Sequence, residues 1–226
     1  MASIVPQMSL FLGIIPALLL LWIGLRGYEG LYKDKTIFLM FIVGIITGFI
    51  AALIELISAS SALVFFIILF PILEQLFKTI ILNLGRFHEK RETVIYGLSL
   101  GLGFGSVFTP ASLLLVGSKI TDTLTILLIV IGSFGIIMYH AAAGLLIGYG
   151  VFTNRAMTYL FLSIVFELPI TVTSFITVYY NMTNLQFLIV IYGAIVFWFA
   201  VYRIMPRIRD DLERRKRTLK TETVKT

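Results

Sequence analysis

Seven long apolar stretches separated by short polar segments dominate the pattern of this chain. They cover residues 9–25, 36–57, 61–84, 93–117, 123–151, 157–180 and 185–205. A transmembrane helix needs about 20 mostly apolar residues, so each stretch reaches or approaches the length of one span. None alternates apolar and polar residues as the strands of a membrane barrel do. We therefore expect an all-α, polytopic transmembrane helix bundle, in which the fifth span is long enough to tilt strongly or to contain a break.

Composition agrees with a membrane protein and narrows its chemistry. Hydrophobic residues make up 59% of the chain and charged residues 13%, whereas soluble domains carry about 25% charged residues. The chain has no cysteine, which excludes disulfides, thiolate metal sites, iron–sulfur clusters and a cysteine nucleophile. Any metal must therefore be held by histidine, carboxylate or water ligands.

Basic residues in the predicted loops indicate an orientation. The first, third and fifth loops carry Arg26, Lys33, Lys35, Arg86, Lys90, Arg91 and Arg155. The second and sixth loops have no basic residue, and the fourth has only Lys119. Because positive residues collect on the cytoplasmic side, we expect the N-terminus outside and the C-terminus inside the cell membrane.

This topology divides the chain into two parts. Residues 1–205 form the predicted bundle, and residues 206–226 form a basic cytoplasmic tail that continues the last helix. The formal charge of +6 comes mostly from the end of the chain, where it suits anionic lipid headgroups. The aromatic residues expected between the basic residues of a nucleic-acid binder are missing from the tail, so nucleic acid is not an expected partner. Asn181-Met182-Thr183 falls in an external loop and is a candidate glycosylation acceptor.

Five ionisable side chains fall within the apolar stretches: Glu55, Glu74, Lys78, His140 and Glu167. Such groups are costly in a membrane and usually face a protected interior site. At 1.5 Å per residue, three of them lie at about 15 Å from the inner end of their own span. These three are Glu74, His140 and Glu167, on three different helices. We therefore expect them to converge, with Lys78 one turn below Glu74 on the same face.

Each of these groups also has a purely structural interpretation. Glu74 and Lys78 could form an ion pair that holds helices together, and His140 could be neutral with a single hydrogen bond. Glu167 could bond backbone groups freed by the proline two residues later, and Glu55 could lie at the membrane surface. In the functional interpretation, Glu74 is a metal ligand or general base influenced by Lys78, and His140 is a metal ligand.

A run of glycines marks the predicted fourth span. Gly97, Gly101 and Gly105 recur every four residues and leave one helical face without side chains. Such a face allows close approach of a neighbouring helix. We expect close helix packing along it.

Several of these motifs occur together in a fixed order. They are Glu74-Gln75-Leu76-Phe77-Lys78, a basic loop, Ile95-Tyr96-Gly97, Gly101-Leu102-Gly103-Phe104, His140 and Gly148-Tyr149-Gly150. In this order, residues 71–150 resemble the PrsW-type intramembrane proteases, within the wider superfamily of CAAX-type and bacteriocin-processing membrane proteases. The resemblance implies hydrolysis of peptide bonds within the membrane by metal-assisted or glutamate-activated water.

The resemblance is incomplete at two positions. The family has a Glu-Glu-x-x-Lys motif, a Phe-x-x-x-Glu motif and a later histidine. Four residues match these motifs: Glu74, Lys78, Phe104 and His140. Gln75 replaces the second glutamate, and Phe108 stands where the second motif has its carboxylate. Glutamine cannot accept a proton at neutral pH and phenylalanine cannot bind a metal, so two carboxylates are lost.

Three functional hypotheses remain. The first is an intramembrane metalloprotease in which Glu74 is base or ligand, His140 and Glu167 are ligands, and Gln75 is an oxyanion donor or supports a ligand. Glu167 is our own assignment, because a catalytic metal needs about three protein ligands. One divalent metal, zinc in the first place, is then the cofactor, although an arrangement without metal fits the residues equally well. The others are a non-catalytic relative that binds a membrane protein or joins a larger assembly, and a transporter or ion pathway.

Overall fold

The computed structural model describes residues 5–58, 65–116 and 123–223; the start of the predicted third span and the Lys119 loop lie outside these ranges. Every regular element within them is helical, which confirms the all-α prediction. The elements are α1 (Val5–Leu25), α2 (Asp34–Ser58), η1 (Phe65–Leu69), α3 (Phe70–Leu82), η2 (Gly85–Phe87), α4 (Glu92–Gly105), α5 (Phe108–Val116), α6 (Thr123–Phe152), α7 (Ala156–Tyr179), η3 (Thr183–Leu185) and α8 (Gln186–Thr223).

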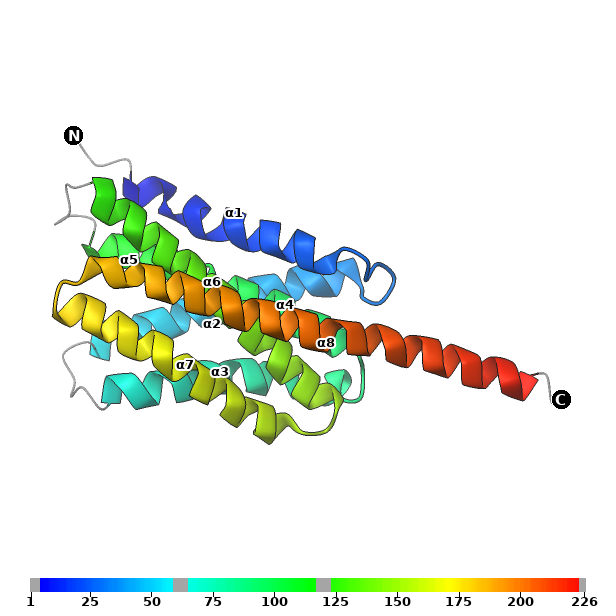
Figure 1. Ribbon diagram of the computed structural model, residues 1–226. Helices are drawn as coiled ribbons and strands as arrows, with labels where there is room; N and C mark the ends of the chain where they lie inside the picture. The colour runs from blue at the N-terminus through cyan, green and yellow to red at the C-terminus, as the bar shows by residue number, and fades with distance from the viewer. Residues whose placement is uncertain (1–4, 59–64, 117–122, 224–226) are drawn as a thin grey trace.

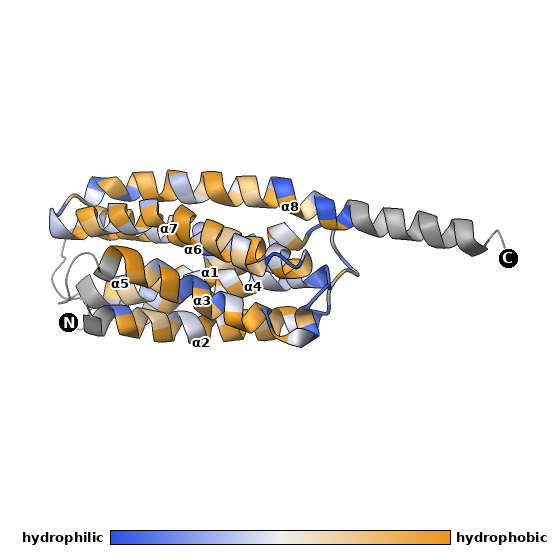
Figure 2. Cartoon of the chain, turned by 90° about the horizontal axis from the view of Figure 1, so that it is seen from below, coloured by the Kyte–Doolittle hydropathy of each residue, from blue (hydrophilic) through white to orange (hydrophobic). Residues whose placement is uncertain are grey.

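The helices form an elongated bundle, and α8 continues well beyond the other helices at one end (Figure 1). Helix α4 occupies the middle, where it packs against α6 and α2 and also contacts α1. All of its residues from Thr93 to Gly105 are buried. Large apolar side chains of the surrounding helices are exposed instead, for example Phe38, Phe161 and Trp198. Hydrophobic positions accordingly cover much of the outside of the bundle, and hydrophilic ones gather towards its ends (Figure 2). This distribution is the one expected of a bundle surrounded by lipid.

Five helical stretches in the described part of the chain are long and apolar enough to cross a membrane. They are Asp34–Glu55, Glu92–Ala111, Thr123–Phe152, Ala156–Tyr179 and Thr183–Arg209. The apolar part of α1, Ser9–Leu25, is shorter, and α3 has 13 residues. Pro71 lies in the first turn of α3, a position that suits proline because the first turn needs no N–H donor. The described part of the predicted third span is divided between η1 and α3.

Of the two possibilities for the long fifth span, a strong tilt or a break, the break does not occur. Helix α6 is continuous over 30 residues. The fourth predicted span, in contrast, is interrupted at Ser106 and Val107, between α4 and α5. Pro110 follows closely and cannot donate a hydrogen bond to the carbonyl of Ser106 four residues earlier. This carbonyl faces Gly13 of α1, where an added Cβ would lie only 1.9 Å from its oxygen.

The glycines of α4 pack directly against α6, as predicted. A Cβ added at Gly97 would lie 2.1 Å from the carbonyl oxygen of Gly144, and one at Gly101 would lie 2.1 Å from that of His140. The opposite face of α4 meets α2 in the same way, because a Cβ at Gly103 would lie 2.1 Å from the oxygen of Phe41. Helix α4 is thus held between two backbones, one of which carries His140.

Candidate metal centre

Helix α3 directs its polar residues into the bundle. Its buried positions are Phe70, Pro71, Glu74, Gln75, Lys78, Thr79 and Leu82, which recur at helical spacing along one face. Leu76 and Ile80 on the other side are exposed. The apolar stripe expected of an amphipathic helix therefore points outwards, and the polar stripe points inwards. This inversion brings a carboxylate, an amide and an ammonium into the interior.

The three side chains predicted to converge do so. Glu74 of α3, His140 of α6 and Glu167 of α7 each offer a ligand atom, and these atoms lie within 4.8 Å of one another. His140 Nε2 is 3.6 Å from Glu74 Oε2, and His140 Nδ1 is 4.0 Å from Glu167 Oε1. All three residues are at most 5% exposed. The group can therefore hold a metal ion.

Gln75 ties the group to its surroundings. Its Nε2 donates a hydrogen bond of 2.6 Å to Glu167 Oε2 and a longer one of 3.5 Å to the hydroxyl of Tyr139. Tyr139 in turn donates to the backbone oxygen of Ser163 on α7, at 2.5 Å. The amide of Gln75 thus already donates a hydrogen bond to a candidate ligand. This favours a role for Gln75 in orienting Glu167 and disfavours a role as an oxyanion donor. Tyr139 and Ser163 were not singled out from the sequence, because a tyrosine and a serine in apolar helices carry no distinctive signal.

Lys78 is fully buried but does not pair with Glu74 as one interpretation expected. Its Nζ donates to the backbone oxygen of Glu74 at 3.3 Å and lies 3.7 Å from the ring centroid of Phe104. The ion pairs within 4.0 Å of Glu74 and Glu167, among the described residues, are those with His140. The ammonium is stabilised by the aromatic face, and both carboxylates remain directed towards His140.

Aromatic rings enclose the imidazole of His140. Phe104 lies edge-on at a centroid distance of 5.0 Å, and Phe108 is stacked at the same distance. Position 108, where the resembling family has a carboxylate, therefore faces the candidate site. His140 Nδ1 has no hydrogen-bond partner among the described residues. A buried ring nitrogen without a partner is costly unless it binds something.

The charges of the group are unbalanced. Glu74 and Glu167 are within hydrogen-bonding reach of each other, and Lys78 supplies one positive charge nearby. With both carboxylates ionised, one negative charge would remain uncompensated in a low-dielectric interior. A proton shared by the two carboxylates, or a bound cation, would neutralise this charge. Tetrahedral zinc, with bonds of about 2.0–2.1 Å, holds its ligand atoms roughly 3.4 Å apart, so the ligand atoms, which lie within 4.8 Å of one another, would have to move closer together around an ion.

Glu55 lies closer to this group than its place in the sequence suggested. It is half-buried near the end of α2 and interacts electrostatically with Glu74 and Glu167. It is not one of the three residues whose ligand atoms cluster. Glu55 therefore lies beside the candidate metal centre without belonging to it.

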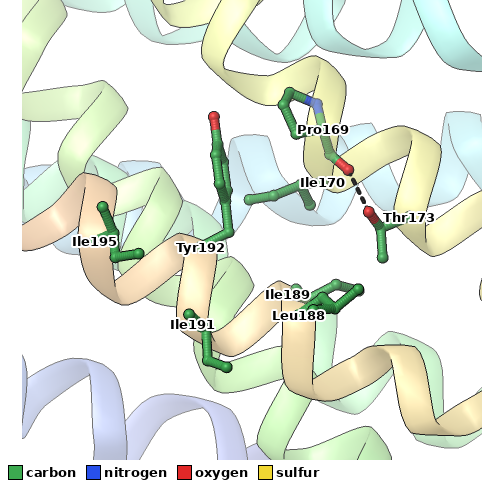
Figure 3. A pocket seen from close by; sticks show the side chains of 8 residues that line it. All are labelled: Pro169, Ile170, Thr173, Leu188, Ile189, Ile191, Tyr192 and Ile195. Carbon is green, nitrogen blue, oxygen red and sulfur yellow. Dashed lines mark hydrogen bonds between the residues drawn. The ribbon is translucent and has the colours of Figure 1, made fainter.

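An apolar groove lies beside the helix that carries Glu167. It has a volume of about 280 Å³ and is lined by Pro169, Ile170, Thr173, Leu188, Ile189, Ile191, Tyr192 and Ile195 of α7 and α8 (Figure 3). Tyr192 donates a hydrogen bond of 2.8 Å to the backbone oxygen of Phe166 and interacts electrostatically with Tyr139. The groove therefore adjoins α7, the helix that carries Glu167, but Glu167 is not among its lining residues.

Comparison of the chain with protein-family models, with curated proteins and with solved structures finds no match. The arguments on function therefore rest on the residues and their geometry.

The hydrogen bond between Gln75 and Glu167 makes a testable prediction. Gln75→Leu keeps the bulk but removes the donor to Glu167, so we expect the affinity for Zn²⁺ to fall about 10- to 100-fold, as is typical when a residue that orients a ligand is lost. Leu76→Ala is the matched control, because Leu76 is the next residue and faces outwards. The measurement is a zinc titration against a competing chelator, and equal affinities for the two variants would contradict the assignment.

Proposed function

We propose that the chain is a multi-pass integral membrane protein that hydrolyses peptide bonds of other membrane proteins at a divalent metal held by Glu74, His140 and Glu167. The observation that carries the proposal is the convergence of these three buried side chains within 4.8 Å. Zinc binds both histidine nitrogens and carboxylate oxygens, and its catalytic sites have three protein ligands and one further position for water. The resemblance of residues 71–150 to PrsW-type proteases supports the same chemistry.

The residues divide the work of hydrolysis as follows. A divalent metal held by Glu74, His140 and Glu167 would polarise a bound water and would stabilise negative charge on the carbonyl oxygen. Glu74 would accept the proton of the attacking water and pass it to the leaving amine. A carbon–oxygen bond forms and the peptide carbon–nitrogen bond breaks. Gln75 holds Glu167 in place through its amide, and Lys78 keeps a positive charge beside the carboxylates.

We also propose the full topology. In addition to the five long helices, α1 and the combined run of η1 and α3 would cross the membrane and bring the number of spans to seven. Basic residues that follow α1, precede α4, follow α6 and lie near the end of the apolar part of α8 would then share the cytoplasmic side of the cell membrane. Residues 1–205 would form the bundle and 206–226 a cytoplasmic tail, of which α8 forms most as a continuous helix to Thr223. Asn181, exposed in the turn after α7, would be accessible for glycosylation on the outside.

A second function is favoured by the site itself. Phe108 stacks on His140, and the amide of Gln75 donates a hydrogen bond to Glu167. Positions 75 and 108 are the two at which the resembling family has carboxylates. A protein that keeps the geometry but lacks these carboxylates suits a non-catalytic role, in which it binds a membrane protein or forms a subunit of an assembly. Such a protein would retain a partner through purification in mild detergent.

The proposed activity predicts cleavage that depends on Glu74. Membranes of cells that express the full chain should contain new protein N-termini within or near transmembrane segments. Glu74→Gln preserves the size of the side chain but removes the base, and we expect at least a hundredfold loss of these products, as for other lost proton-transfer groups. The measurement is quantitative sequencing of protein N-termini in the membrane fraction.

Glu89→Gln is the matched control, because it removes the same charge from an exposed loop residue. Products that persist in Glu74→Gln would overturn the protease assignment. A chain that binds one metal per molecule yet yields no such products would instead establish the non-catalytic function.

A further inference from the structure

A polar pocket lies at the end of the bundle from which α8 extends, away from the metal centre. It has a volume of about 250 Å³ and is lined by Gly30, Leu31, Tyr32, Lys33, Arg91, Glu92 and Tyr96. These residues come from the loop between α1 and α2 and from the start of α4. The pocket joins a loop to the central helix of the bundle, at the end where hydrophilic positions gather (Figure 2).

The pocket presents hydrogen-bond donors that lack acceptors. Tyr96 is 4% exposed, and its hydroxyl oxygen accepts a hydrogen bond of 3.2 Å from the backbone N–H of Lys33. The hydroxyl hydrogen itself finds no acceptor in the described part of the chain. Arg91 Nη1 is buried and likewise has no hydrogen-bond partner there. Buried donors of this kind, one of them charged, are costly when left unsatisfied, so the pocket is suited to a ligand rich in acceptor oxygens.

The two cations of the pocket are not neutralised by a direct ion pair. Neither Lys33 nor Arg91 has a carboxylate within 4.0 Å among the residues that the structure describes, since the ion pairs found there are those of His140. Burial, and to a lesser extent Asp34 and Glu29, raises the pKa of Tyr32 above its usual 10.0, so its phenol stays neutral. Among the lining residues, Glu92 carries a carboxylate. It lies in the first turn of α4, where the helix dipole stabilises a negative charge.

We propose that this pocket binds a phosphate group, with Arg91, Lys33 and Tyr96 as its donors. The planar guanidinium can form two parallel bonds to phosphate oxygens, and the ammonium adds a second positive charge. The pocket lies where the apolar spans give way to polar loops, which is the depth of phospholipid headgroups. The phosphate of an anionic phospholipid and free inorganic phosphate share this chemistry. The site is independent of the metal centre and of the activity proposed above.

The test uses the full chain and two sources of phosphate. In one arm, the protein is reconstituted in nanodiscs of phosphatidylcholine with or without phosphatidylglycerol, and native mass spectrometry counts the phosphatidylglycerol retained. In the other arm, the thermal midpoint in detergent is measured with inorganic phosphate and with chloride at equal ionic strength. We expect retention or a raised midpoint in the wild-type chain. An effect of the lipid alone identifies a headgroup site, and an effect of inorganic phosphate alone identifies a site for a soluble anion.

Variants decide whether the pocket is responsible. Arg91→Gln should reduce the effect about tenfold, as expected for the loss of a charge-assisted hydrogen bond, and Tyr96→Phe should reduce it less. Lys35→Gln removes a positive charge from the same segment outside the pocket and should leave the effect unchanged. Glu92→Gln removes the opposing charge and should strengthen it. No effect of either phosphate source, or equal losses in Arg91→Gln and Lys35→Gln, would overturn the proposal.

Discussion

His140→Leu is expected to lower the affinity for Zn²⁺ or Co²⁺ by about a hundredfold or more, a larger effect than the 10- to 100-fold cost of losing a residue that merely orients a ligand. The imidazole is the only nitrogen ligand of the candidate centre, and both of its ring nitrogens face a carboxylate, at 3.6 and 4.0 Å. Leucine fits between Phe104 and Phe108 and keeps that contact apolar, so the variant should fold. The visible absorption of bound Co²⁺ reports directly on loss of the nitrogen ligand.

The chain offers a matched control for this experiment, since it has two histidines. His88 lies exposed in a loop, where its Nε2 is 2.9 Å from the backbone oxygen of Asn83. His88→Leu should therefore bind Co²⁺ as the wild type does, with the same spectrum. Equal binding by His140→Leu and wild type would show that the buried group is a metal-free polar cluster. A spectrum lost in both variants would place the metal elsewhere.

Gly101→Ala should destabilise the protein by about 1–3 kcal/mol, the usual cost of overpacking a well-packed core. The new Cβ would lie 2.1 Å from the carbonyl oxygen of His140 and 2.8 Å from its carbonyl carbon. These are backbone atoms in the middle of a long helix and cannot move aside alone, so α4 and α6 must separate. The measurement is the free energy of unfolding in mixed micelles of a mild detergent and dodecyl sulfate.

Gly85→Ala provides the comparison. Gly85 lies in η2, and an added Cβ there meets no atom within 4 Å, so we expect a change within about 0.5 kcal/mol. Gly101→Ala should also weaken zinc binding, because the shifted backbone carries His140. Equal stabilities for the two variants would show that α4 and α6 are less closely packed than described here.

Much of the candidate site could be predicted because its ingredients are local. The rise of an α-helix sets the depth of each residue along its span, so Glu74, His140 and Glu167 could be matched in height before their helices were arranged. The spacing of Gly97, Gly101 and Gly105 predicted a helical face free of side chains. It did not identify the partner helix, because any neighbour can approach such a face.

Interactions between helices explain what the sequence did not predict. The position of the Lys78 ammonium depends on the ring of Phe104, a residue of another helix, whereas the spacing of Glu74 and Lys78 predicted an ion pair or an influence of Lys78 on Glu74. From the sequence, Gln75 was either an oxyanion donor or a support for a ligand, and only the approach of α7 made it a donor to Glu167. The length of the fifth span allowed a tilt or a break, but α6 is continuous and the interruption lies in the fourth span, near Ser106 and Pro110.

By itself, the sequence determined that this protein is helical, apolar on the outside and polar at three matched depths, because hydropathy and helical rise act along the chain. The tertiary structure alone decided that these polar groups meet within metal-binding distance, with the imidazole between two carboxylates and the amide of Gln75 on Glu167. The physical reason is that the contacts join α3, α6 and α7, whose rotation and separation are set by the packing of whole helices, such as that of α6 against the glycines of α4, and not by any local preference.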